Sequence, residues 1–403
     1  MGKTIALVGA FDTKGAEYKF VRNCIVHRGH QALLIDVGVL GEPRLAPDIP
    51  SSEVAKAAGY ELQDLIEAQD RGEAMAVMTR GVEALIPRLY GEGRFDGIMA
   101  LGGGGGTSVA CAAMRKLPLG VPKVMVSTVA GTDVAGYVGA KDIVMVPSIV
   151  DVAGINRISR EIFSRAAGAI CGMVETRVPP GDDRPLVVAS MFGNTTQCVE
   201  AAKARLEQVG YEVLVFHATG TGGRTMENLI ESGQIAGVLD VTTTEWADEL
   251  VGGVLAAGPT RLEAAARHGV PAVVAPGCLD MVNFWAPETI PQPFADRRFY
   301  QHNPNITLMR TTPEECGRLG EILAGKLNGS SGPVTVLLPL KGLSAIDAPG
   351  GPFWWPEADQ ALFDALKKNL CDSIPVIEID ANVNDEEFSR QCALVLLEQM
   401  AAV

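Results

Sequence analysis

The feature that most constrains the fold of this chain is a series of short, continuously apolar runs separated by Ala-rich stretches. Examples are TIALVGA at 4–10, DGIMALG at 96–102 and PAVVAPG at 271–277. Continuous apolarity is typical of strands covered by helices on both faces, whereas strands with one wet face alternate apolar and polar residues. The pattern therefore predicts an α/β fold with mostly parallel sheets and disfavours all-α and all-β folds.

The chain also contains an approximate duplication. IALVGAFDTKGAEYKF near the N-terminus parallels LVVASMFGNTTQCVEA in the second half, and FDGIMALGGGGGTSV parallels IAGVLDVTTTEWADE. Each copy predicts a strand, a polar turn and a helix, which is the repeating unit of a Rossmann-like fold. We expect two Rossmann-like domains, residues 1–180 and 181–403, joined near RVPPGDDRP at 177–185, with a ligand cleft between them.

Charge and cysteine usage exclude several classes of partner. The formal net charge of −14 and the pI near 4.9 argue against nucleic acids and anionic membrane surfaces. Small anions remain possible ligands because backbone amides bind them locally. The eight cysteines show no C-x-x-C spacing, and no apolar segment approaches the ~20 residues of a membrane span. We therefore expect a cytoplasmic protein without a zinc site or a disulfide framework.

Five consecutive glycines, Gly102–Gly106, close the apolar run at 96–102. Their amides are predicted to surround phosphate oxygens, with the hydroxyl of Thr107 opening the next helix. A close-packed turn without a ligand is the alternative. The run does not fit the dinucleotide fingerprint G-x-G-x-x-G, because the last glycine would fall on Thr107 or Ser108, and this disfavours a dehydrogenase.

Two further strand ends in the first half carry polar clusters. GAFDTKG at 9–15 is close to a P-loop, but Lys14 precedes the second glycine instead of following it. We expect Lys14 to contact a phosphate. The alternative is a helix-capping aspartate beside a solvated lysine. STVAGTD at 127–133 offers hydroxyls to a nucleotide and Asp133 to a water on Mg²⁺, the alternative being an ordinary turn. The predicted nucleotide-binding residues are Phe11, Asp12, Thr13, Lys14, Gly102, Gly103, Gly104, Gly105, Gly106, Thr107, Ser127, Thr128, Gly131 and Asp133.

The second half repeats this chemistry at two strand ends. FHATGTGGRT at 216–225 combines a histidine with a glycine/threonine turn before a helix, and TTTE at 242–245 places three threonines before a carboxylate. A triple threonine is also ordinary strand or cap chemistry. The predicted second-ligand residues are Thr219, Gly220, Thr221, Gly222, Gly223, Thr242, Thr243, Thr244 and Glu245. The predicted catalytic residues are Lys14, His217 and Glu245.

Several of these segments together resemble one known family. GAFDTKGAEY, GGGGGT, DVAGINRISREI, MFGNTTQCV, FHATGTGGRTMENLI and DVTTTEWADEL are similar to the Tm-one-like ATP-binding family of bacterial, fungal and plant proteins. The resemblance covers essentially the whole chain and implies ATP as ligand, a two-domain Rossmann-like fold and a tendency to form homodimers. The chain departs from the family at Gly104, where a serine is usual, so amide contacts to phosphate are expected to persist better than side-chain contacts.

These features predict an ATP-binding protein of one of two kinds. The first is an ATP-dependent enzyme, a kinase or ligase, that acts on a small carboxylate metabolite with Mg²⁺ accompanying the nucleotide. The second is a nucleotide-gated binding or regulatory module, because no nucleophile, metal cage or general-base pair is evident in the sequence. Four acidic residues distinguish the two hypotheses: Asp12, Asp133, Glu245 and Asp248. Convergence on a bound phosphate favours catalysis, whereas use as helix caps favours the module.

Overall fold

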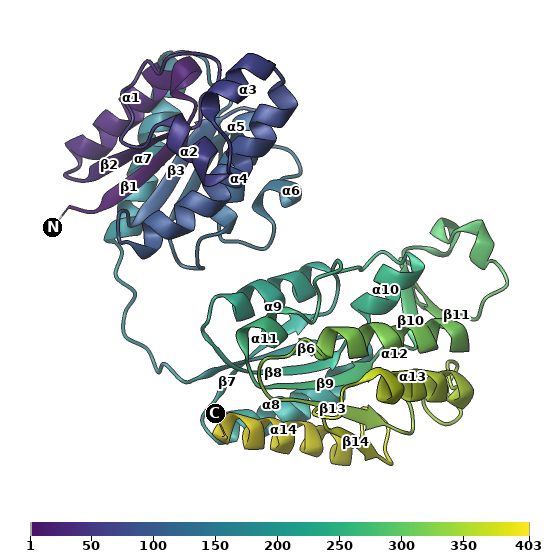
Figure 1. Ribbon diagram of the computed structural model, residues 1–403. Helices are drawn as coiled ribbons and strands as arrows, with labels where there is room; N and C mark the ends of the chain where they lie inside the picture. Colours follow the sequence, from purple (N-terminus) through teal and green to yellow (C-terminus); the bar gives the residue numbers. More distant parts are fainter. Residues whose placement is uncertain (1, 403) are drawn as a thin grey trace. The chain divides into compact units, whose positions relative to one another are not determined.

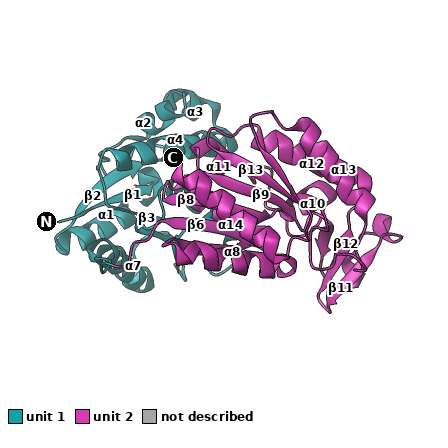
Figure 2. Ribbon diagram, turned by 90° about the horizontal axis from the view of Figure 1, so that it is seen from below, with its two compact units in different colours: residues 1–180 teal, residues 181–403 magenta. Residues whose placement is uncertain are grey.

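A computed structural model describes residues 2–402 and divides the chain into two compact units, Met1–Pro180 and Gly181–Val403. Figure 1 shows the elements of both units, and Figure 2 colours the units separately. Each unit contains a parallel sheet with helices on both faces, which confirms the expected α/β class. Among the described residues, none of the helices is both long and apolar enough to cross a membrane.

Unit 1 contains a five-stranded parallel sheet in the order β2-β1-β3-β4-β5. The strands are β1 (Thr4–Gly9), β2 (Gln31–Asp36), β3 (Gly97–Gly102), β4 (Lys123–Ser127) and β5 (Val144–Pro147). The helices are α1 (Phe11–His27), α2 (Ser51–Ala57), α3 (Leu62–Ala68), α4 (Arg71–Gly91), α5 (Gly104–Arg115), α6 (Ala135–Val138) and α7 (Arg157–Glu175). The strand order reverses between β1 and β3, which is the point where open α/β sheets bind ligands.

The apolar runs of unit 1 form strands because both faces of the sheet are covered. Ile5 and Leu7 of β1 pack in one cluster with α1 and α7, while Ala6 and Val8 pack in the opposite cluster with α2, α4 and α5. Successive side chains of a strand point to opposite faces, so a run buried on both faces has no polar positions.

Unit 2 repeats this arrangement in a six-stranded parallel sheet of order β14-β13-β9-β8-β6-β7, which reverses between β6 and β8. The strands are β6 (Leu186–Met191), β7 (Glu212–His217), β8 (Ile235–Thr242), β9 (Ala272–Gly277), β13 (Val334–Pro339) and β14 (Val376–Ile379). Helices α8 (Thr196–Gln208) and α14 (Glu386–Ala401) cover one face. The remaining helices are α9 (Thr221–Glu231), α10 (Glu245–Val251), α11 (Ala264–His268), α12 (Pro313–Leu327) and α13 (Pro356–Asn369).

An antiparallel sheet interrupts unit 2 between β9 and α12. Its strands, in the order β10-β12-β11, are β10 (Met281–Phe284), β11 (Phe299–Asn303) and β12 (Ile306–Arg310). The sequence pattern did not predict this sheet, because β11 is mostly polar and exposed and β12 ends in an arginine. That arginine, Arg310, is fully buried.

Candidate functional site

Tyr18 fixes the spacing of β1 and β3 at the reversal point of unit 1. Its hydroxyl donates to the carbonyls of Val8 (2.5 Å) and Leu101 (3.0 Å) and accepts from the amide of Leu101 (2.8 Å). The ring fills the space beside Gly9 so closely that a Cβ there would lie 2.1 Å from it. Burial raises the pKa of Tyr18, so the hydroxyl stays protonated. The two loops that leave β1 and β3 therefore start from fixed positions.

The glycine run forms the end of β3 and the first turn of α5. Gly103 is the N-cap residue and no side chain caps the helix. The first helical hydrogen bond joins the amide of Thr107 to the carbonyl of Gly103 at 2.8 Å. Within the described residues, the amides of Gly104, Gly105 and Gly106 have no acceptor, and Gly106 is exposed. Helix N-termini with free amides carry partial positive charge and bind anions.

Two predicted hydroxyls brace this turn from inside the unit. Thr107 Oγ1 donates to the carbonyl of Gly103 at 2.8 Å and lies 2.6 Å from Ser127 Oγ. Both side chains are fully buried. The hydroxyls of Thr107 and Ser127 thus tie the glycine turn to the end of β4, and the backbone amides are the groups that face outward.

Arg71, which the sequence analysis did not single out, adds positive charge beside the glycine turn. Its Nη2 lies 4.0 Å from the position that a Cβ on Gly105 would take. The guanidinium is exposed and no carboxylate of the described residues pairs with it. No local pattern links Arg71 to the run; only the packing of α4 on α5 brings the start of α4 to this place.

The first turn of α1 buries two of the predicted ligand residues, and Asp12 holds the loop that follows β2. Asp12 Oδ2 accepts from the amide of Leu40 (2.8 Å) and Oδ1 from the amide of Thr13 (2.7 Å). The start of α1 is held by Asp36, whose Oδ1 accepts from the amide of Phe11 at 2.9 Å. Burial raises the pKa of Asp36. Phe11 and Asp12 therefore stabilise the loop from inside, and Asp12 does not cap α1.

Lys14 and Thr13 remain at the surface of the same turn of α1. Thr13 is exposed and Lys14 is half-buried. The Lys14 ammonium donates to the carbonyl of Val152, and Lys14 itself has non-helical backbone angles (φ −122°, ψ 22°) inside α1. The partner of Lys14 at the carboxyl edge of the sheet is therefore a neutral carbonyl and not a carboxylate.

The loop after β4 contributes one residue beside the glycine turn. Thr128 is exposed, its amide donates to the carbonyl of Gly102 at 3.2 Å, and its Oγ1 lies 3.6 Å from the Cβ position of Gly103. Asp133 instead accepts from the amide of Ala135 at 2.9 Å, and Gly131 lies in the exposed turn before it. The structure thus brings Thr128 to the glycine turn, whereas the carboxylate of Asp133 holds the first amide of α6.

In unit 2, the predicted anion-binding turn already holds a carboxylate of the protein. Glu245 Oε1 accepts from the amides of Gly220 (2.7 Å) and Gly223 (3.1 Å) at the start of α9. Arg261 Nε donates to Glu245 Oε2 at 2.7 Å. Glu245 is fully buried, and a Cβ on Gly223 would lie 2.1 Å from its Oε2. This corrects the expectation that these amides and Glu245 face a second ligand or a reacting group.

Arg261 is the centre of a buried ion cluster that explains this arrangement. It also donates to Asp240 at 2.5 and 2.6 Å and to Glu227 at 3.1 Å. Burial disfavours the charged guanidinium, but the carboxylates of Asp240, Glu245 and Glu227 raise the pKa of Arg261 well above its ordinary value. One buried cation thus holds the ends of β8, α9 and α10 together.

The three threonines are also inside unit 2. All are fully buried; Thr242 Oγ1 lies 2.7 Å from Thr195 Oγ1, and Thr243 Oγ1 donates to the carbonyl of Ala275 at 3.2 Å. Thr244 Oγ1 accepts from Asn283 Nδ2 at 3.5 Å. Their expected role toward a ligand is therefore replaced by a structural one.

Only part of the predicted second site reaches the surface of unit 2. His217 is exposed at the end of the edge strand β7, and Thr219 and Thr221 are exposed beside it. Thr221 Oγ1 accepts from Arg224 Nη2 at 3.2 Å, and Gly222 lies under the carbonyl of His217. The exposed imidazole of His217 and the buried carboxylate of Glu245 therefore do not form a shared surface site.

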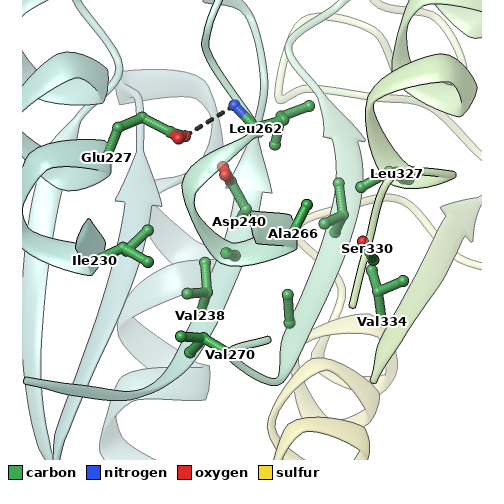
Figure 3. Close-up of a pocket in the computed structure, with 13 residues that line it drawn as sticks. Glu227, Ile230, Val238, Asp240, Leu262, Ala266, Val270, Leu327, Ser330 and Val334 are labelled. Atoms are coloured by element: carbon green, nitrogen blue, oxygen red, sulfur yellow. Dashed lines mark hydrogen bonds between the residues drawn. The ribbon is translucent and has the colours of Figure 1, made fainter. Parts of the chain in front are cut away.

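Two cavities in the described structure are lined by none of the predicted phosphate-binding residues. The one in Figure 3 has a volume of about 10 Å³ and lies between α9, β8, α11 and β9, where Glu227 accepts from the amide of Leu262 at 2.8 Å. It can hold about one water and no metabolite. An open hollow of about 500 Å³, lined by Lys3, Arg28, His30 and Arg177 among others, lies at the amino end of β1 and away from the glycine turn. In the part of the chain that the structure describes, no group of three or more His, Cys, Asp or Glu side chains could hold a metal ion.

The family of the chain follows from comparison with known proteins. The N-terminal domain of "Uncharacterised protein family (UPF0261)" matches residues 3–179, and the C-terminal domain of that family matches residues 184–400. The chain belongs to the UPF0261 family. A UPF0261 protein of Clostridium tetani (strain Massachusetts / E88) is 52% identical over 402 residues, which cover 99% of this chain and 100% of that protein.

The sequence resemblance to the Tm-one-like family is confirmed by a tomato relative. The ToMV resistance protein Tm-1(GCR237) of Solanum lycopersicum is 44% identical over 330 residues, which cover 80% of this UPF0261 chain but 44% of the tomato protein. Among solved structures, a UDP-N-acetylglucosamine 2-epimerase from Rickettsia bellii aligns with 100% of this chain and 98% of its own, at 12% identity and a TM-score of 0.23. A likeness this low carries no inference about activity.

Proposed function

We propose that unit 1 of this UPF0261 protein binds the phosphate groups of ATP at the start of α5. The observation that supports this is the row of free amides at Gly104, Gly105 and Gly106, at the point where the strand order reverses. Backbone amides and the helix dipole attract anions at such a position. The phosphate part of the proposal rests on this geometry, and the adenine base rests on the resemblance to an ATP-binding family.

Local charge favours an anion here although the whole chain is acidic. Arg71 lies beside Gly105, and Lys14 lies near the start of α1, where its ammonium donates to the carbonyl of Val152. Asp12, one of the predicted acidic residues, is buried and accepts two amides. A nucleotide polyphosphate would therefore meet amides and cations, and Mg²⁺ would arrive with the nucleotide, held by phosphate oxygens and water.

The acidic residues favour binding without turnover over a kinase or ligase. Asp12 holds a loop, Asp133 accepts from the first amide of α6, and Glu245 pairs with Arg261. Asp248 accepts from the amide and the side chain of Asn283 at 2.7 and 2.6 Å. Since each carboxylate already has its partners within its own unit, we propose a nucleotide-responsive binding module, with ATP-dependent catalysis on a small carboxylate as the weaker alternative.

Titration calorimetry of the full chain with Mg²⁺-ATP tests the proposal through Gly104. A Cβ at Gly104 has nothing nearer than Tyr137 Oη at 3.9 Å, so Gly104→Asp should fold. An aspartate in the first turn suits the helix dipole but repels phosphate, and we expect the Kd for ATP to rise by about tenfold or more.

Gly104→Ala is the matched control, because it keeps the amides and adds no charge; its Kd should stay close to that of the wild type. Equal ATP affinity in Gly104→Asp and wild type would contradict phosphate binding at α5. Phosphate release from ATP should stay at the level of buffer, and steady release in the presence of a small carboxylate would restore the enzyme hypothesis.

A further inference from the structure

A second buried cluster lies at the carboxyl ends of the adjacent strands β9 and β13 of unit 2. It contains one guanidinium, that of Arg310, and three carboxyl groups, those of Asp280, Asp347 and Asp359. Arg310 Nη2 lies 2.6 Å from Asp359 Oδ1 and 3.7 Å from Asp347 Oδ1. All four side chains are buried. If every carboxyl group were ionised, the cluster would carry two uncompensated negative charges.

Two carboxyl oxygens of this cluster have no hydrogen-bond partner in the described structure. They are Asp280 Oδ1 and Asp347 Oδ1, and both residues have 0% exposure. Asp280 Oδ2 accepts from Ser344 Oγ at 2.8 Å. A buried carboxylate oxygen without a partner is costly unless the group is neutralised. The hydrogen bonds of the cluster and the single positive charge of Arg310 therefore do not compensate three ionised carboxylates.

The other titratable groups that face the cluster do not supply this charge. The thiols of Cys278 and Cys316 are both buried. The guanidinium groups of Arg297 and Arg298 donate to the carbonyls of Arg310 (2.8 Å) and Trp354 (3.3 Å), and Arg297 pairs with Glu315 outside the cluster. Burial raises the pKa of Cys316 to about 11 and that of Cys278 well above its ordinary value, so both thiols are neutral. A proton on the carboxyl groups is the remaining means of compensation.

Electrostatics supports a bound proton near neutral pH. Burial, followed by the charge of Asp347, raises the pKa of Asp280 to about 7 and that of Asp359 to about 8, although Arg310 acts in the opposite direction. Burial also raises the pKa of Asp347. Because the three groups interact, the proton belongs to the cluster and not to one residue.

The same residues hold the loop 340–355 between β13 and α13 in its closed position. Ser344 lies on this loop, and the amide of Leu343 donates to Asp347 Oδ2 at 3.0 Å. Arg310 Nε donates to the carbonyl of Phe353 at 2.8 Å. The loop also rests on β9, where the carbonyl of Leu343 accepts from the amide of Cys278 at 2.9 Å. The loop therefore covers the edge of the sheet at which α/β proteins bind ligands.

We propose that the Asp280–Asp347–Asp359–Arg310 cluster is a proton-controlled latch, which keeps the loop 340–355 closed while protonated and releases it when the proton is lost. Asp280 directly precedes β10 and Arg310 is the last residue of β12, whereas Ser344 and Asp347 lie on the loop. Loss of the proton increases the repulsion among the carboxylates. Movement of the loop relieves this repulsion because it carries the carboxylate of Asp347 into water. The ligand of this site is a proton. Its release exposes the carboxyl edge of the unit 2 sheet, and its binding covers that edge.

Hydrogen exchange of the full chain between pH 6 and 9 tests the latch. We expect the protection factors of loop amides in 340–355 to fall in the wild type by up to about tenfold per pH unit, the limit for release of one proton. Asp280→Asn keeps an oxygen for Ser344 but is neutral at every pH, so its loop should stay protected across the range. Asp380→Asn is the matched control: it removes an exposed carboxylate that pairs with Lys341 at the start of the loop, and its pH response should equal that of the wild type.

Infrared spectra provide the second readout. At pH 6, the wild-type spectrum minus that of Asp280→Asn should show a protonated carboxyl band that disappears at pH 9. Burial also raises the pKa of Asp248 to about 7, but Asp248 is present in both proteins, so the subtraction removes its band. If Asp280→Asn does not fold, Asp359→Asn replaces it with the same expectation. Identical pH responses in the wild type and the folded variant would overturn the proposal. Loop protection at pH 8 that depends on Na⁺ or K⁺, without a carboxyl band at pH 6, would also overturn it.

Discussion

At the scale of single residues, Tyr18 shows how one side chain positions the proposed phosphate site. Its hydroxyl makes three hydrogen bonds between β1 and β3, and its ring requires glycine at position 9. Sequence analysis placed the glycine turn correctly beside a strand end but gave no role to Tyr18. A tyrosine on an amphipathic helix reads as ordinary core, and its contact with Leu101 joins residues that are far apart in the sequence.

Tyr18→Phe is therefore expected to destabilise unit 1 without changing its fold. The substitution keeps the ring but leaves the buried amide of Leu101 without its acceptor, which costs about 1–3 kcal/mol of unfolding free energy. Urea unfolding of the full chain, followed by far-UV circular dichroism, measures this loss. Tyr300→Phe, at a partly exposed position on β11, serves as control and should unfold like the wild type. Equal midpoints for Tyr18→Phe and wild type would show that the hydroxyl contributes nothing.

At the scale of elements, α5 and α9 show what the sequence could and could not predict. Both helices lie at the carboxyl edge of a parallel sheet and were predicted to follow a glycine/threonine turn, but each begins inside that turn, at Gly104 and Thr221. The amides of α5 are free, whereas those of α9 hold Glu245. Glu245 comes from a different loop, and its burial depends on Arg261, so only the tertiary structure distinguishes an open anion site from an occupied one.

Glu245→Gln tests the structural role of the Glu245 side chain at the start of α9. The amide side chain can still accept from Gly220, but Arg261 loses one of its three carboxylate partners. We expect unit 2 to lose about 1–3 kcal/mol of stability, as for a buried hydrogen bond to a charged group. The Kd for ATP measured by calorimetry should not change. A variant that keeps wild-type stability but loses a ligand-dependent activity would return Glu245 to the catalytic role first assigned to it.

At the scale of the whole molecule, the continuous apolar runs predicted parallel strands covered by helices on both faces, and the approximate duplication predicted two units of this kind. The five strands β1 to β5 and the six strands of unit 2 all coincide with continuous apolar runs. The antiparallel sheet and the buried clusters around Arg261 and Arg310 were not predicted. Charged residues read as surface in a sequence, and their burial depends on partners that only the folded unit assembles.

Because the proposed ATP site lies entirely in unit 1, nucleotide should stabilise one unit and not the other. All four tryptophans, Trp246, Trp285, Trp354 and Trp355, belong to unit 2, so tryptophan fluorescence follows the unfolding of unit 2 alone, while calorimetry follows both units. With Mg²⁺-ATP at ~100 times its Kd, the unfolding free energy of unit 1 should rise by ~2.7 kcal/mol. Calorimetry should then show one unfolding transition at a higher temperature, and the transition followed by fluorescence should not move. Gly104→Asp should lose this shift and Gly104→Ala should keep it. An ATP-dependent shift confined to the fluorescence transition would place the nucleotide in unit 2 and contradict the assignment of the site to α5.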